Sequence, residues 1–210
     1  GKSTQFALLT KRLQSMGVDF KTMEFPQYSQ PSSALIRMYL GGEFGTRPSD
    51  VNAYAASTFF AVDRYVSYNC YWKEKYLNGE IFLADRYTTS NMIHQASKIC
   101  DNEEKSKFLE WLFHLEYVVY GLPKPDLTFF LDMPTEIAKS LMKERDNKFD
   151  KDASKDIHER NADYLEKSYK NACFIADKFM WEHIMCAQNG EIRTIEDIND
   201  EIFEKIIKII

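Results

Sequence analysis

Two side chains with the chemistry to handle phosphate stand together in the stretch FLADRYTTS, residues 82–90. Asp85 and Arg86 follow an apolar run that reads as a strand, and a hydroxyl-rich turn comes after them. A structural ion pair is the alternative, but a surface pair contributes little and a buried pair is costly. At a phosphate site Arg86 offers a planar fork to anionic oxygens, and Asp85 can hold a water of Mg²⁺ or orient the arginine. We therefore favour the functional interpretation.

The chain opens with GKSTQ, which matches the second half of the phosphate-loop motif G-x-x-x-x-G-K-[ST]. In that loop, backbone N–H groups and a lysine surround nucleotide phosphates at the start of a helix. A helix whose N-cap is Ser3 is the structural alternative. The motif requires a helix that begins immediately after GKST, and the apolar spacing of residues 3–16 predicts one. We expect the natural protein to carry about 10–20 further residues that supply a strand and the rest of the loop.

A third candidate group lies in STFFAVDRY, inside a helix expected over residues 50–77. Phe60 and Arg64 are four residues apart and therefore share one face of that helix. Core aromatic residues beside a snorkelling arginine are the alternative, and for Phe59 that interpretation is favoured. For Phe60 and Arg64, a flat ring next to a fork of donors suits a planar base with a carbonyl edge.

The elements that must position these residues alternate along the chain. Strands are expected over residues 18–25, 81–87, 126–133 and 183–188, as apolar runs of the kind that are buried on both faces. This order predicts an α/β fold with a doubly wound parallel sheet sandwiched by helices, whose first strand is missing from the given sequence. Ligands of such sheets bind beyond the carboxyl ends of the strands. The expected helices cover residues 3–16, 32–40, 50–77, 90–100, 103–120, 134–145, 154–180 and 194–210.

Composition narrows the class of protein. The 210 residues are 44% hydrophobic and 28% charged, which is typical of a soluble domain. A formal charge of -5 argues against a broad nucleic-acid surface, and no apolar run reaches the length of a membrane helix. The four cysteines show no CxxC spacing, so we expect buried thiols in a reducing compartment, the cytoplasm.

Taken together, the motifs resemble the thymidylate kinase family of P-loop nucleoside monophosphate kinases. The matching segments span nearly the whole chain: GKSTQ, FP, ALIR, FFAVDR, DRYTTS and GLPKPDLTFFLDM. The resemblance implies one kinase domain over residues 1–210 that transfers the γ-phosphoryl group of ATP to dTMP with Mg²⁺, giving dTDP for dTTP synthesis. It also implies a homodimer, and the Ala-, Phe- and Tyr-rich helix 50–77 is compatible with that.

The resemblance assigns roles at the two nucleotide sites. Arg37 and Arg86 would clamp the phosphate of dTMP, Phe60 would stack on thymine, and Arg64 would donate to its O4. The other residues implied for the dTMP site are Phe25, Pro26, Ser90, Asn91, His94 and Gln95. Those implied for ATP are Gly1, Lys2, Ser3, Thr4 and Arg145, with Lys2 on the β- and γ-phosphates and with Ser3 and Asp85 as ligands of Mg²⁺, the latter through water.

A lid is implied over about residues 143–156. Arg145 would lie against adenine, and Lys148 would add positive charge to the transferring phosphoryl group, which needs positioning and charge more than covalent chemistry. Closure of such a lid excludes water and so suppresses hydrolysis of ATP. The implied catalytic residues are Lys2, Asp85, Arg86, Arg145 and Lys148.

Three departures from the family leave alternatives open. One is whether the catalytic basic residue lies in the phosphate loop or in the lid, and Arg145 and Lys148 favour the lid. Tyr28 stands where some relatives have an arginine, and Arg37 fits the variant that uses an arginine on the next helix. His94 replaces an aromatic residue, often tyrosine, beside the deoxyribose, so the preference for deoxyribose stays open. Another deoxynucleoside or nucleoside monophosphate kinase, or a nucleotide-binding protein without catalysis, is the alternative function.

Overall fold

The computed structural model describes residues 1–148 and 162–210, with side chains for residues 1–141 and 164–210. The chain forms two compact units. The terminal unit comprises Gly1–Asp19, Pro125–Ser154 and Cys173–Ile210, and the central unit comprises Phe20–Lys124 and Lys155–Ala172. In the described residues, no helix has the length and apolar character needed to cross a membrane.

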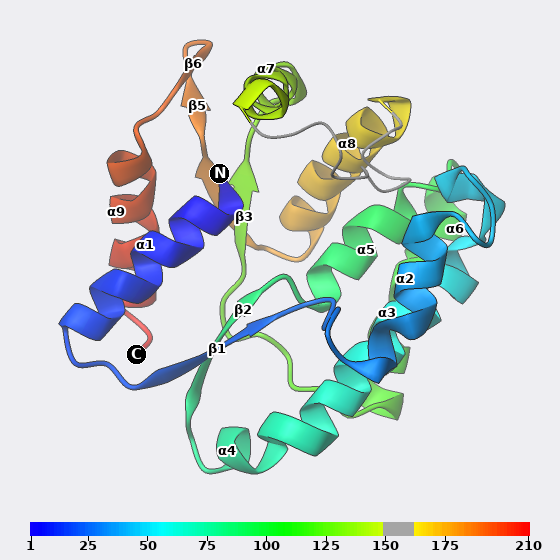
Figure 1. The fold of residues 1–210 in the computed structure, drawn as a ribbon, viewed down its shortest axis with the longest axis horizontal. Coiled ribbons are helices and arrows are strands. Elements are labelled where there is room, and N and C mark those ends of the chain that lie inside the picture. The colour runs from blue at the N-terminus through cyan, green and yellow to red at the C-terminus, as the bar shows by residue number, and fades with distance from the viewer. Residues whose placement is uncertain (149–161) are drawn as a thin grey trace. The chain divides into compact units, whose positions relative to one another are not determined.

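The central unit is built on a pair of parallel strands, β1 (Phe20–Glu24) and β2 (Ile81–Asp85) (Figure 1). Their register aligns Glu24 with Asp85, so both strands end at the same edge. The two strands confirm the sequence prediction, but the expectation of burial on both faces was wrong for both, because Thr22 of β1 and Ala84 of β2 are exposed. The reason is that each strand of this pair has a single hydrogen-bonded neighbour among the described strands.

Helices of the central unit follow the expected order. The helix predicted over residues 50–77 forms three consecutive segments, and the side chain of Asn52 caps its start by accepting from the N–H of Ala55. The middle segment is a π-helical turn, a feature common at functional sites. The helical segments are η1 (Pro31–Ser33), α2 (Ala34–Gly41), η2 (Pro48–Asp50), α3 (Ala53–Ser67), η3 (Tyr68–Trp72), α4 (Lys73–Leu77), α5 (Thr88–Ala96), α6 (Asn102–Phe113) and η4 (His114–Val119).

An aromatic cluster fixes the ends of β1 and β2 against these helices. Trp72 lies near its centre, with its ring centroid 4.6 Å from Tyr68 and 5.2 Å from Phe82. Large aromatic rings bury much apolar area, and tilted pairs of rings add to that stabilisation. The buried members of the cluster are Phe25, Tyr68, Trp72, Tyr87 and Leu122.

The terminal unit carries a second parallel pair, β3 (Phe129–Asp132) and β4 (Glu182–Met185). Helix α8 (Ala162–Lys178) begins in the range of the central unit and ends in that of the terminal unit. The remaining elements of the terminal unit are α1 (Lys2–Ser15), α7 (Thr135–Lys148), β5 (Ala187–Gln188), β6 (Glu191–Ile192) and α9 (Ile195–Ile206).

The described strands form three separate two-stranded sheets. The architecture is therefore mixed α/β with parallel pairs, and a continuous doubly wound sheet is not shown. The antiparallel pair β5–β6 was not predicted and is closed by Asn189-Gly190, both with positive φ. Asn-Gly is the dipeptide that a tight hairpin turn favours, so the sequence did carry this signal.

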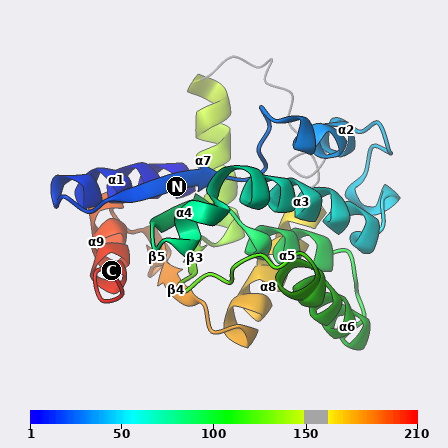
Figure 2. The same ribbon diagram turned by 90° about the horizontal axis from the view of Figure 1, so that it is seen from below.

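Helices α1 and α9 lie side by side in both views of the molecule (Figure 1 and Figure 2). The pair buries Leu13 of α1 and Ile198 of α9. A polar contact crosses it as well, because the amide of the buried Asn199 donates to Gln5 and accepts from Arg12. Met16 is the C-cap of α1 and is exposed.

Candidate active site

The ends of β1 and β2 place two predicted site segments next to each other. The N–H of Phe25 donates to the carbonyl of Asp85 over 3.1 Å, which extends the strand pairing by one residue. Phe25 is buried, and a cis peptide bond joins it to Pro26. The segments Phe25-Pro26 and Asp85-Arg86 therefore emerge together at the carboxyl edge, as the sequence predicted.

Arg86 adopts a left-handed backbone conformation, with φ of 68°. Such a conformation costs a residue with a side chain about 1–2 kcal/mol and is concentrated at functional sites. The side chain is exposed, and its Nη1 donates a long hydrogen bond of 3.5 Å to the Oγ of Ser90. The chain thus holds a strained backbone that projects a guanidinium group into solvent, an arrangement suited to an anionic ligand.

Tyr87 follows Arg86 directly and is held in place by two contacts. Its ring packs 5.8 Å from Phe25, and its hydroxyl donates to the carbonyl of Pro123 over 3.1 Å. Burial raises the pKa of Tyr87 far above its usual range, so the hydroxyl stays protonated and remains a donor. Asp85 itself is half-buried at the end of β2, where its carboxylate is a hard oxygen donor of the kind that Mg²⁺ prefers.

Arg37 lies exposed on α2 and braces the loop that follows Pro26. Its Nη1 donates to the carbonyl of Tyr28 over 2.7 Å and to the Oγ of Ser33 over 2.5 Å. The residue that replaces the arginine of some relatives is therefore itself a partner of Arg37, through its backbone. These bonds occupy one end of the guanidinium group and anchor it.

The same loop is held from below by Asp63, a buried carboxylate that sequence reasoning missed. Its Oδ2 accepts from the N–H of Gln27 over 2.8 Å, and its Oδ1 accepts from the hydroxyl of Ser32 over 2.5 Å. Hydrogen bonds to a carboxylate are stronger than neutral ones and order the segment that makes them. Asp63 adjoins Arg64 in the quoted FFAVDRY segment, and an acid in an otherwise apolar helix was the available signal.

Arg64 does not snorkel to solvent but is 2% exposed. Its Nε donates to the Oε2 of Glu116 on η4, and its Nη2 donates to the Oε1, both over 2.6 Å. The amide of Asn91 on α5 joins this pair by donating to Glu116 over 3.1 Å. Sequence reasoning missed Glu116, and the structure brings the predicted Arg64 and Asn91 together through it.

Several buried polar atoms on α3 and α5 have no hydrogen-bond partner among the described residues. They are the hydroxyl of Ser57, the carbonyl oxygen of Asn91 and both amide atoms of Gln95, which is fully buried. An unpaired buried polar group costs about 1–3 kcal/mol, so native proteins retain few of them without a reason. Unmet donors and acceptors on these two helices, one of them on the Asn91 that Glu116 joins to Arg64, suit a polar ligand.

Aromatic rings flank this group. Phe60 is half-buried and meets Tyr39 edge-on, with ring centroids 6.3 Å apart. Phe59 packs against Tyr39 and Phe44, which supports its interpretation as a core residue. His94 is half-buried and stacks on Tyr164 of α8 at a centroid distance of 6.3 Å.

A further missed residue is Lys98, which follows α5. Its ammonium group donates over 2.9 Å both to the hydroxyl of Tyr39 and to the carbonyl of Val51. Burial lowers the pKa of Lys98 to about 7. The lysine thus fastens the end of α5 to the residues that flank Phe60.

In the terminal unit, the predicted phosphate-binding residues form the start of α1. The helix begins at Lys2 with Gly1 as its N-cap, so the prediction of a helix at GKST is confirmed. The alternative of Ser3 as N-cap was wrong, because Ser3 lies inside the first turn. Lys2, Ser3 and Thr4 are exposed at this N-terminus, where the helix dipole and unpaired N–H groups favour anions.

The structure describes only part of the predicted lid. Helix α7 extends to Lys148, but the side chains of Arg145 and Lys148 lie outside the described residues. Most of the predicted lid, residues 149–156, lies outside them altogether. The lid and its two basic residues remain predictions.

Comparison with known proteins gives a consistent result. Residues 1–198 match the family model described as thymidylate kinase. The chain is 30% identical to the thymidylate kinase of Mycobacterium tuberculosis over 170 residues, which cover 80% of this chain and 77% of that one. It is 25% identical over 209 residues to the thymidylate kinase of Plasmodium falciparum, covering 100% and 85% of the two chains. A probable thymidylate kinase of Thermococcus onnurineus is 26% identical over 204 residues, covering 96% and 89%.

Proposed function

The chain belongs to the thymidylate kinase family, and we propose that it transfers the γ-phosphoryl group of ATP to dTMP, giving dTDP and ADP. A phosphate oxygen of dTMP forms the new bond to the γ-phosphorus, and the bond from that phosphorus to ADP breaks. The observation that carries the proposal is the set of groups in the central unit. Arg86 is exposed and has a strained backbone at the carboxyl edge of β1 and β2. Arg64 and Glu116 form a buried pair, and the amide of Gln95 has no partner among the described residues. The helices that carry these last three residues pack together.

Arg86 is the group proposed to hold the phosphate of dTMP. Its guanidinium is exposed beyond the carboxyl end of β2, and a planar fork binds two phosphate oxygens at once. The strained backbone fixes where the side chain begins, which is the positioning that phosphoryl transfer needs. Arg37 is proposed as the second part of the clamp, supported by its anchorage on the loop after Pro26.

The base would be read by the group around Glu116. Thymine presents the acceptor O4 and the donor N3–H, and Arg64 and the unpaired carbonyl oxygen of Asn91 offer the complementary donor and acceptor. Cytosine has an amino group at C4 and no hydrogen on N3, so both contacts would be lost. Phe60 would stack on the ring, Ser90 and Gln95 would supply further polar contacts, and His94 would lie beside the sugar.

ATP is proposed to bind at the start of α1. Gly1, Lys2, Ser3 and Thr4 form an exposed helix N-terminus with no acidic residue in its first turn. Mg²⁺ bridges the phosphates and neutralises developing charge in reactions of this class. The hydroxyl of Ser3 and the carboxylate of Asp85 are oxygen donors that fit this ion, the latter directly or through water.

The remaining expectations belong to the proposal as well. A doubly wound P-loop kinase fold is supported by the family and by parallel pairing in two sheets. A homodimer is supported by exposed apolar side chains such as Tyr54 and Tyr65 on α3, and sedimentation at micromolar concentration tests it. A cytoplasmic location follows the sequence argument alone.

Turnover distinguishes the proposed enzyme from a nucleotide-binding protein without catalysis. In the natural full-length protein with Mg-ATP, dTMP should trigger formation of ADP and dTDP in equal amounts. Stabilisation by dTMP and ATP in a thermal melt, with neither product formed, would instead support the non-catalytic alternative.

A further inference from the structure

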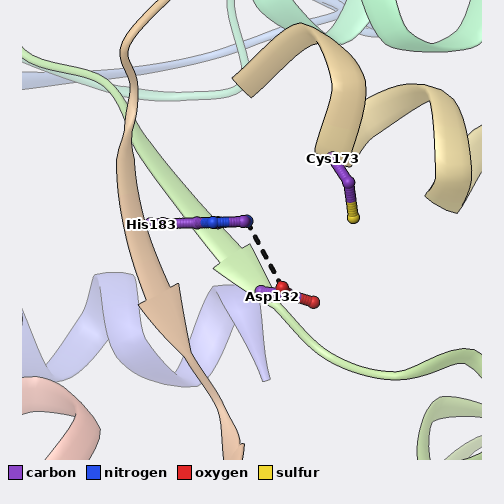
Figure 3. A group of neighbouring side chains, drawn as sticks. All are labelled: Asp132, Cys173 and His183. Atoms are coloured by element: carbon purple, nitrogen blue, oxygen red, sulfur yellow. Dashed lines mark ion pairs between the residues drawn. The ribbon is translucent and has the colours of Figure 1, made fainter. Parts of the chain in front are cut away.

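Three side chains of different chemistry converge in the terminal unit. Asp132 ends β3, His183 lies on β4 and Cys173 lies on α8 (Figure 3). One ligand atom of each, a carboxylate oxygen, an imidazole nitrogen and a thiol sulfur, lies within 4.8 Å of the other two. Asp132 is buried, while Cys173 and His183 are half-buried.

The strand register explains why the first two side chains meet. Phe130 is the direct partner of His183 across the parallel pair, and Asp132 is two residues further along β3. Side chains alternate between the faces of a strand, so Phe130, Asp132 and His183 share one face. The ring of Phe130 stacks on the imidazole of His183 at 4.9 Å with 25° between the planes, which fixes the orientation of that imidazole.

The distance between the side chains of His183 and Asp132 matches the separation of two ligands that bind the same metal ion. The Nε2 of His183 lies 3.3 Å from the Oδ2 of Asp132. Nevertheless, this buried nitrogen makes no hydrogen bond to any described residue. Two light-atom ligands about 2.0–2.1 Å from one tetrahedral metal ion are separated by about 3.3 Å. The observed spacing is thus already suited to coordination, and Figure 3 shows Cys173 directed towards the same place.

We propose that Asp132, Cys173 and His183 form a binding site for a zinc ion. Imidazole, thiolate and carboxylate are the three ligand types that zinc uses in proteins. Mg²⁺ and Ca²⁺ are disfavoured because they select oxygen ligands, and a thiolate is a poor ligand for them. Three protein ligands leave the fourth tetrahedral position for water.

Binding would join three elements that are distant in sequence. The thiol of Cys173 gives up its proton to solvent and forms the metal–sulfur bond, while Asp132 binds as the carboxylate and His183 as the neutral imidazole. The ion then links the end of β3 and the first half of β4 to α8. Because it binds the folded arrangement, it stabilises the terminal unit by mass action.

Cobalt is a direct probe, because Co²⁺ replaces Zn²⁺ in such sites and is coloured. The natural full-length protein is titrated with Co²⁺ in a reductant that lacks thiols, with excess Mg²⁺ present. We expect visible bands of tetrahedral Co²⁺ and a thiolate-to-cobalt charge-transfer band that both saturate at one equivalent. Zn²⁺ should abolish them by competition.

Variants locate the site. Cys173→Ser should remove the charge-transfer band, and His183→Gln should weaken binding at least about tenfold. The matched control is Cys100→Ser in the central unit, which should leave the titration unchanged. Burial was expected for this thiol from the sequence, but the structure places it exposed to solvent. Calorimetry of Zn²⁺ binding in buffers of different ionisation enthalpy should report about one proton released by the wild type.

Two results would show that these three residues do not bind zinc. A charge-transfer band that survives in Cys173→Ser, or a titration without a saturating equivalent, would overturn the proposal and leave His183–Asp132 as an ion pair. Circular dichroism of the metal-free variants shows whether they are folded. If Cys173→Ser does not fold, the His183→Gln affinity and the competition by Zn²⁺ in the wild type decide instead. These readouts measure binding, so they do not depend on the kinase activity.

Discussion

Arg64 and Glu116 form two parallel hydrogen bonds of 2.6 Å in the interior of the central unit. Their side chains are 3% and 1% exposed, so the pair is almost wholly removed from water. A buried pair of this kind is held by its geometry, and the loss of one partner leaves an uncompensated charge. Because Asn91 also donates to Glu116, one carboxylate orients both residues proposed to read the base.

Removal of the carboxylate charge should destabilise the fold. We expect Glu116→Gln to lower the free energy of unfolding by about 3–5 kcal/mol, because the guanidinium of Arg64 stays buried without a counter-charge. Urea denaturation measures this. The control is Glu103→Gln, which removes an exposed ion pair to Lys107 and should cost less than about 1 kcal/mol. Equal losses in the two variants would show that the buried pair has no special role.

Replacement of both Arg64 and Glu116 separates their effect on the stability of the fold from their effect on the recognition of dTMP. Arg64→Met combined with Glu116→Leu fills the same space without charge, and it should recover most of the stability lost in Glu116→Gln. The ratio kcat/KM for dTMP should nevertheless remain at least about tenfold below the wild type, a loss of about 1.4 kcal/mol in transition-state binding. Steady-state kinetics and urea denaturation of the same preparations test both halves. A double variant that regained full activity would mean that Arg64 does not contact the base.

Arg86 should show the opposite signs for stability and activity. Arg86→Gly relieves the left-handed strain, while the greater freedom of glycine in the unfolded chain offsets part of the gain, so stability should rise by at most about 1 kcal/mol. Loss of the phosphate contact should lower kcat/KM by about 10- to 100-fold. Arg86→Ala keeps the strain and loses the contact, so it should match the glycine variant in activity but not in stability. Wild-type activity in either variant would exclude Arg86 as a phosphate ligand.

Gln95 offers a test of the unpaired amides. Gln95→Leu removes a buried amide that has no partner among the described residues, so the ligand-free protein should become more stable by about 1–3 kcal/mol. The KM for dTMP should rise, because a polar contact to the substrate is lost. The matched control Gln14→Leu alters an exposed amide and should change both quantities little. A destabilised Gln95→Leu protein with unchanged KM would indicate that the amide is structural.

Much of this site could be predicted from the sequence because its residues lie at element ends. The apolar runs before Phe25 and Asp85 predicted two parallel strands, and strand topology alone brings their ends together. The pairing of Arg64 with Glu116 could not be foreseen in this way. The two residues are 52 positions apart, and their contact depends on how α3 and η4 pack rather than on any local pattern.

The backbone of Arg86 was also beyond prediction. Positive φ is expected for glycine, asparagine or aspartate, and nothing in Asp-Arg-Tyr signals it. The Asn189-Gly190 turn shows the reverse case, in which a sequence signal was present and was not used. Burial on both faces was expected for β2 from its apolar run, yet Ala84 is exposed.

Lys98 predicts a pH dependence of stability. Burial lowers its pKa from 10.5 to about 7, so between these values the unfolded chain binds more protons than the folded chain. The free energy of unfolding should therefore rise as the pH increases from 7 to 8.5, by up to about 1.4 kcal/mol per pH unit from this residue. Lys98→Met should lose that increment when urea denaturation is compared at the two pH values. Parallel pH profiles for the two proteins would contradict a shifted lysine.

The most direct test of the central claim is a substrate panel with the natural full-length protein. Initial rates of ADP formation with Mg-ATP are measured for dTMP, dCMP, UMP and dGMP, and kcat/KM is compared. We expect kcat/KM for dTMP to exceed that for dCMP and dGMP by at least about tenfold. Cytosine lacks the N3–H and O4 pattern that Asn91 and Arg64 match, whereas guanine offers an equivalent N1–H and O6 but on a larger, two-ring base. UMP shares that pattern but carries a 2′-hydroxyl, and it should also be slower. Equal or better use of any of the other three would contradict the assignment of dTMP as the substrate.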